Sequence, residues 1–86
     1  MFSKRFKVKK REFDKKINTV FQHKLRLLMN CYTVRDIMVN EQEQFCRFKK
    51  SHKISGIKMM DPKEYTVKYE IEPAEDDDYI MLKIIV

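Results

Sequence analysis

The chain has 86 residues, which is enough for one domain with a modest hydrophobic core and leaves little room for a second. Hydrophobic residues make up 43% of the sequence and charged residues 37%, so aromatic and branched side chains are numerous enough to exclude wholesale disorder. The formal net charge of +6 points to an acidic partner, and a single glycine excludes the glycine-rich loops that cradle nucleotide phosphates.

The first predicted element is a basic strand or extended arm within residues 1–11. Phe6 and Val8 alternate with basic residues, and alternation of apolar and polar side chains is typical of a half-buried strand. The alternative is a helix from about Ser3, because Phe6 also shares one helical face with apolar residues further along the chain.

The next segment is predicted to be a helix with one apolar face. Its apolar residues are spaced by four, three, one, four and three positions: Phe13, Ile17, Val20, Phe21, Leu25 and Leu28. Glu12 and Lys16 stand four positions apart in the order that stabilises a helix. Neither Gly nor Pro interrupts the run, and Asn30 is a suitable residue to end it.

A second helix is predicted to begin after Thr33. Thr33 and Asp36 resemble a capping box, in which the two side chains satisfy backbone N–H groups of the first turn. The residues that follow at spacings near three and four are apolar with the exception of Glu41: Val34, Ile37, Met38, Glu41, Phe45 and Phe48. The alternative is a strand over residues 32–39.

The remaining third of the chain is predicted to be β-structure. Residues 54–60 form a short strand or a connection, and Asp61-Pro62 marks a turn. Strict alternation over residues 65–72 predicts a strand, residues 73–78 a turn, and residues 79–86 a second strand. The two strands should pair as an antiparallel hairpin within residues 64–86.

The last of these strands is apolar on both faces apart from Lys83, as is typical of a strand that lies centrally in a sheet or at a subunit interface. We expect residues 4–9 or 54–60 to pair beside it, or a second subunit to cover it in a homodimer. The fold class predicted is α+β, with two helices packed on a small antiparallel sheet in a single domain, residues 1–86.

The charge is divided along the chain. Residues 1–53 hold 15 Lys and Arg against 5 Asp and Glu, a net charge of +10, whereas residues 54–86 hold 4 against 8, a net charge of −4. A basic segment of this kind can neutralise phosphates and release their counterions. The candidate nucleic-acid-binding residues form two clusters: Lys4, Arg5, Lys7, Lys9, Lys10, Arg11, Lys15 and Lys16, and then Arg47, Lys49, Lys50 and Lys53.

This basic segment has competing interpretations. Phe2 and Phe6 lie among the cations and can stack on unpaired bases. A solvated face that aids solubility is the alternative, and a membrane surface or an acidic protein is a weaker one. No zinc-finger spacing and no known base-reading motif accompanies the charge, so any contact with DNA or RNA should be mainly electrostatic.

Nothing in the sequence predicts catalysis. His23, Cys31, Cys46 and His52 are not spaced as paired metal ligands, and no base or oxyanion hole accompanies either cysteine. We therefore expect a nonenzymatic protein without metal or cofactor. Two cysteines, no signal peptide and no apolar run long enough to cross a bilayer predict a cytoplasmic location. The alternative function is that of a small regulatory protein of phage origin that binds a host protein and modulates it.

Overall fold

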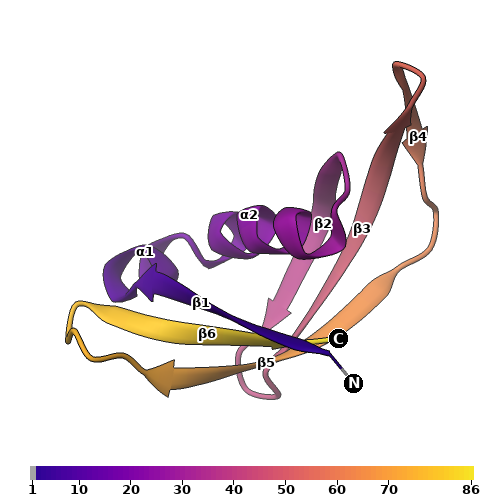
Figure 1. Ribbon diagram of the computed structural model, residues 1–86. Coiled ribbons are helices and arrows are strands. Elements are labelled where there is room, and N and C mark those ends of the chain that lie inside the picture. Colours follow the sequence, from indigo (N-terminus) through magenta and orange to yellow (C-terminus); the bar gives the residue numbers. More distant parts are fainter. Residues whose placement is uncertain (1) are drawn as a thin grey trace.

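The computed structural model describes residues 2–86 as two helices on one side of an antiparallel sheet (Figure 1). In chain order the elements are β1 (Ser3–Lys9), α1 (Lys10–Lys15), α2 (Ile17–Met29), β2 (Thr33–Asn40), β3 (Phe45–Ile54), β4 (Ile57–Met60), β5 (Tyr65–Pro73) and β6 (Tyr79–Ile85). The α+β class predicted from the sequence is confirmed, although its helices are not the two that were predicted.

The strands are ordered β1-β6-β5-β3-β2 across the sheet, and every pairing is antiparallel. The two helices connect β1 at one edge of the sheet to β2 at the other, so α2 runs across a single face (Figure 1). One edge of β3 pairs with β2, and its other edge is long enough for two partners: the first half pairs with β5 and the second half with β4. The β3–β4 pair therefore projects from the body as an arm (Figure 1).

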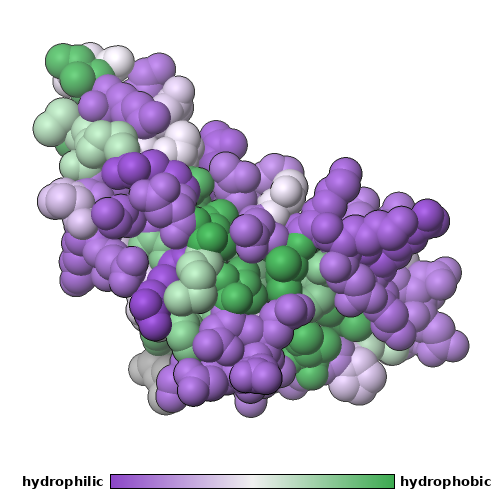
Figure 2. Space-filling view, turned by 180° about the vertical axis from the view of Figure 1, so that it is seen from behind, coloured by the Kyte–Doolittle hydropathy of each residue, from purple (hydrophilic) through white to green (hydrophobic). Residues whose placement is uncertain are grey.

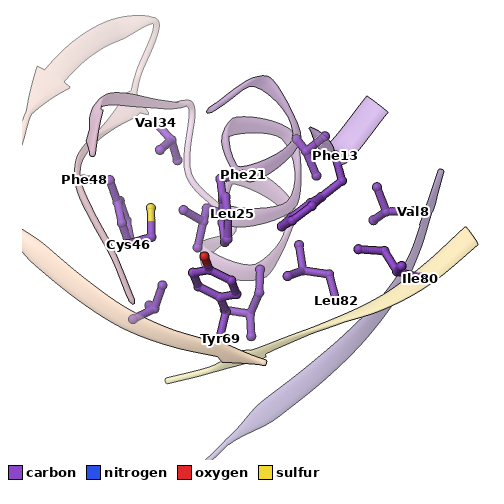
Figure 3. Close-up of a cluster of buried hydrophobic side chains, with 13 residues drawn as sticks. Val8, Phe13, Phe21, Leu25, Val34, Cys46, Phe48, Tyr69, Ile80 and Leu82 are labelled. Atoms are coloured by element: carbon purple, nitrogen blue, oxygen red, sulfur yellow. The ribbon is translucent and has the colours of Figure 1, made fainter. Parts of the chain in front are cut away.

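The core lies between α2 and the covered face of the sheet (Figure 3). Phe21 and Leu25 of α2 are completely buried, as are Leu82 and Ile84 of β6. Burying side chains of this size stabilises a fold by about 1.5–3 kcal/mol each. The ring of Phe21 meets that of Tyr69 edge-on, with centroids 4.9 Å apart, which fixes the helix over the centre of the sheet.

The predicted first helix is present but divided. Lys16 has φ −134°, which breaks the helical path between α1 and α2. The residues that show the helical period nevertheless reach one core, because Phe13 of α1 and Phe21 of α2 are both buried there. Asn30 ends α2 in the left-handed conformation, as its side chain predicted. The strand prediction for residues 4–9 is also confirmed, and the helical alternative there is wrong.

The predicted second helix after Thr33 is wrong, because this segment forms β2 and β3. The cause is a β-bulge: Asp36 has φ 53°, and the register with β3 shifts between Arg35 and Met38. An extra residue in the strand separates the inward-facing Val34 and Ile37 by three positions instead of two. That spacing imitates a helical period. Thr33 forms no cap, and its hydroxyl instead hydrogen-bonds to that of Ser51 across the strands.

The predicted hairpin at residues 64–86 is confirmed as β5 and β6. β6 is a central strand, with β1 on one side and β5 on the other, as its two-sided apolar composition suggested. Its backbone hydrogen-bonding edges are both occupied within the chain. A homodimer through this strand would have to use its outward side chains, and it stays a prediction.

Candidate nucleic-acid interface

The face of the sheet opposite the helices, which we call the open face, is formed by side chains of β1, β6, β5, β3 and β2. Directly paired residues of neighbouring strands point to the same side, so the register identifies this open face. In β1 and β6, Val8 and Ile80 are paired and buried under the helices, which turns their neighbours Lys7 and Lys9 to the open face. In β3, Cys46 and Phe48 are buried, which turns Arg47 outward between them.

The open face is strongly basic. Arg5, Lys7 and Lys9 enter it from β1, and Arg47 and Lys49 enter it from β3, so members of both predicted clusters share one surface. Three more cations join them there, none of which was among the predicted site residues: Arg35 of β2, Lys68 of β5 and Lys83 of β6. The outward acidic residues of β5 are Glu70 and Glu72. Cations therefore outnumber anions severalfold along the paired strands of this face.

Aromatic rings lie among these cations. The Lys7 ammonium lies 4.6 Å from the centroid of the Tyr79 ring, and the Arg47 guanidinium lies 5.2 Å from that of Phe45. Both rings are partly exposed. Basic side chains that follow a phosphate backbone, interleaved with aromatic rings on which bases stack, are typical of surfaces that bind single-stranded nucleic acid. The open face thus combines the two kinds of side chain that bind nucleic acid without base-specific readout.

Two of the cations are engaged by the glutamates. Arg5 donates from Nε to Glu72 at 2.7 Å, and Lys83 lies 3.3 Å from Glu70. The hydrogen bond raises the pKa of Arg5 and lowers that of Glu72, so both stay charged at neutral pH. Lys7, Lys68 and Arg47 have no ion-pair partner among residues 2–86. These three are the cations most available to a polyanion.

Other predicted site residues gather at a different place, around α1. A hollow of about 650 Å³ borders the open face at Lys9 and Tyr79, and its other lining residues are Lys10, Arg11, Asp14, Lys15, Asp77 and Asp78. A second hollow of about 380 Å³ beside it adds Glu12 and Lys16. The backbone N–H of Lys10 donates to the carbonyl of Asp78 at 2.9 Å, which holds the acidic β5–β6 turn against this corner. Its cations therefore face acidic neighbours and are less available than those of the open face.

The remaining predicted residues are separated from both groups. Lys50 is paired with the buried Val34, so it lies on the helix side of β3, where its ammonium sits 4.5 Å from the Tyr65 ring. Lys4 lies over the ring of Phe6, which packs against the core and does not lie free among the cations as a stacking residue. Phe2 is 57% exposed. Lys53 belongs to the arm.

The arm carries four of the ten large hydrophobic residues that are exposed in the described chain, and its end is green in Figure 2. Ile54 and Ile57 are paired across the hairpin and are 59% and 64% exposed, and Met59 and Met60 of β4 are about half exposed. The sequence marked this segment only as a strand or a connection. The available signal was the Ser-Gly pair between two isoleucines, which indicates a two-residue hairpin with its apolar residues at the tip.

The arm is anchored at its root by Asp61. One carboxylate oxygen accepts the Tyr65 hydroxyl, and the other accepts the Lys63 backbone N–H at 2.9 Å. The Asp61 backbone N–H donates to the carbonyl of Lys50 on β3 at 3.1 Å. The hydrogen bond from Tyr65 is the main cause of the lowered pKa of Asp61, so the carboxylate stays charged at neutral pH.

The other potentially reactive or metal-binding side chains lie apart from one another. Burial raises the pKa of Cys46 to about 12, and it also raises the pKa of Cys31. Within residues 2–86, no three His, Cys, Asp or Glu side chains come close enough together to hold a metal ion. No helix in this described part of the chain has the length and apolar character needed to cross a membrane.

Comparison with protein-family models, with curated proteins and with solved structures finds no match to this chain. Function must therefore be inferred from charge, exposure and geometry.

Proposed function

We propose that the protein binds nucleic acid through the open face of its sheet, mainly by contacts to phosphates. The observation that carries the proposal is the gathering of cations from strands that are distant in sequence. Lys7 of β1, Arg47 of β3 and Lys68 of β5 lie on one uncovered surface without ion-pair partners in the described chain. A bound polyanion would offset the mutual repulsion of these like charges.

The partly exposed Phe45 and Tyr79 extend this proposal to unpaired strands. Stacking on aromatic side chains tolerates any base, and it stabilises binding by about 1–3 kcal/mol per base. The two outward carboxylates of β5 on this face, Glu70 and Glu72, are already engaged by Lys83 and Arg5. Recognition by this face would therefore depend on charge and stacking, with little sequence preference.

The test is a binding titration on duplex DNA, single-stranded DNA and single-stranded RNA by fluorescence anisotropy, at a series of salt concentrations. We expect the affinity to fall linearly with salt on a logarithmic scale. Lys7→Gln combined with Arg47→Gln should weaken binding and reduce the slope on duplex DNA by about 0.9 for each phosphate that is no longer neutralised. Absence of binding at low salt, or binding without a salt slope, would refute the proposal.

The matched control is Lys15→Gln combined with Lys16→Gln. These substitutions remove the same charge from the α1 corner, whose cations lie beside the acidic residues Asp77 and Asp78. The control variant should retain most of the wild-type affinity. If both double variants bind equally weakly, net charge alone decides binding, and the open face has no special part.

A regulator that binds a host protein is the second candidate, because the exposed apolar end of the arm suits a protein partner as well (Figure 2). Affinity capture from a cell lysate, with and without nuclease, separates the two candidates. A stoichiometric protein that persists after nuclease treatment favours the regulator. Recovery of nucleic acid alone, which disappears on nuclease treatment, favours the open-face proposal.

A further inference from the structure

The arm carries three successive cross-strand pairs whose chemistry changes along its length. Ile54 is opposite Ile57 at the tip, Lys53 is opposite Lys58 next to it, and His52 is opposite Met59 behind them. Ser55 and Gly56 form the connecting turn, and both have positive φ. The end of the arm is therefore an apolar wedge, and the lysine pair one position behind it projects from the opposite face of the ribbon.

The Lys53–Lys58 pair indicates the charge of the partner that the arm binds. Like charges directly opposite each other destabilise a two-stranded ribbon, and no acidic residue of the described chain forms an ion pair with either lysine. A second copy of this chain would bring its own open-face cations, and its acidic β5–β6 turn already lies beside the cations of the α1 corner. An anionic partner would relieve the repulsion between the two lysines, and it must also accept the two exposed isoleucines.

The basic residues of β3 connect the arm to the open face. Arg47, Lys49 and Lys53 stand at odd positions of one continuous strand, and alternate residues of a strand share a side. At about 3.3 Å per residue, the first and last of them are about 20 Å apart. On this side Ser51, between Lys49 and Lys53, is completely buried, so the lysines lead a phosphate backbone toward the arm across one covered position.

We infer that the arm enters the minor groove of double-stranded DNA, with Lys53 and Lys58 at the phosphates and Ile54 and Ile57 inserted at a base step. This inference rests on the proposed function and names the form of nucleic acid that the arm requires. Apolar wedges that enter the minor groove partly unstack one step and kink the duplex by about 20–90°. The anchor of the arm at Asp61 holds the ribbon in place for insertion.

The experiment uses a duplex of about three helical turns with a donor and an acceptor fluorophore at its ends and 2-aminopurine at a central flexible step. Wild-type protein should increase energy transfer, because the ends approach, and should increase 2-aminopurine fluorescence, because the step unstacks. Ile54→Thr with Ile57→Thr keeps two β-branched residues in the hairpin while removing the apolar ends. We expect this variant to abolish both signals and to bind the duplex about tenfold more weakly.

Two further variants control for side effects. Ile71→Thr removes an isoleucine that is 43% exposed on β5, away from the arm, and it should leave both signals unchanged. Lys53→Gln with Lys58→Gln keeps the wedge and should lower the salt slope by about 1.8, the value for two neutralised phosphates. Circular dichroism and the thermal midpoint of each variant verify that the fold is retained.

The outcomes separate this inference from the proposed function. If wild-type protein binds with a salt slope but neither signal changes, or if the arm variants behave as wild type, the open-face proposal stands and the inference falls. If wild-type protein binds no nucleic acid at low salt, both fall. Binding to vesicles rich in phosphatidylserine that needs Ile54 and Ile57, without any kinking of DNA, would assign the arm to a membrane and overturn the inference.

Discussion

At the scale of single residues, the turn of the arm contains an identifiable weakness. Ser55 has φ 52° and Gly56 has φ +80°, the pair of positive values that a two-residue hairpin turn requires. Glycine adopts such values freely, whereas a residue with a Cβ is strained there. The sequence therefore provides one suitable residue at the second turn position and a less suitable one at the first.

We expect Ser55→Asn to stabilise the arm by about 0.5 kcal/mol, because asparagine tolerates the left-handed region and Asn-Gly is a favoured turn pair. The measurement is hydrogen exchange of the backbone amides paired between β3 and β4. Gly56→Ala is the opposing control: a Cβ there meets nothing within 4 Å, so only backbone strain, about 1 kcal/mol, opposes it. Faster exchange in the asparagine variant would contradict this account of the turn.

At the scale of elements, α2 offers two leucines that differ in burial. Leu25 is completely buried against the sheet, and Leu27 is 67% exposed, although only two positions separate them. Leu25→Ala should lower the free energy of unfolding by about 2–5 kcal/mol, because it leaves a cavity in the core. Leu27→Ala should change it by less than about 0.5 kcal/mol. Urea unfolding followed by circular dichroism checks both, and similar decreases would mean that α2 does not pack as described.

The elements differ in how clearly the sequence marks them. The hairpin at residues 64–86 was predictable because Val67 and Tyr69 alternate with polar residues in an uninterrupted strand. The pair β2 and β3 was not, because the bulge at Asp36 disturbs the alternation, and a bulge is a response to tertiary packing. The break at Lys16 likewise has no Gly or Pro to mark it.

At the scale of the whole molecule, Cys46 can report global unfolding. It is completely buried on β3, in the middle of the sheet, and its pKa is raised to about 12. Because the thiolate is the reactive form, iodoacetamide at mildly alkaline pH should modify Cys46 only in molecules that have unfolded. Cys31 is partly exposed and should be modified first, but slowly, since its pKa is also raised.

Mass spectrometry after timed quenching distinguishes the two cysteines.

Since folding raises the pKa of Cys46 from 9.0 to about 12, the native state holds this proton more tightly than the unfolded chain does. The resulting stability is present below pH 9 and is lost as the pH rises toward 12. Modification of Cys46 should therefore accelerate with pH more steeply than that of Cys31. Equal rates for the two thiols in native buffer would contradict the burial of Cys46.

The sequence predicted the basic character of the candidate interface but not which cations form it. Both basic clusters were visible in the sequence, and Lys7 and Arg47 lie on the same open face, on different strands. Strand register decides which cations lie on the open face. The sequence alone could therefore not distinguish these cations from Lys50 and from the residues of the α1 corner. Lys68, in the net acidic part of the chain, was missed because the charge of a segment conceals single residues that tertiary pairing brings to another surface.

The pairing of β1 with β6 also bears on how the chain is made. Among the described elements β1 is synthesised first, and its hydrogen-bonding partner β6 is synthesised last. Until then the nascent chain carries an unpaired strand, a state that favours association with other unfolded chains. Most side chains of β1 are lysine or arginine, and charged residues of this kind discourage such contacts. The basic residues of β1 thus protect the growing polypeptide before they can contribute to any interface.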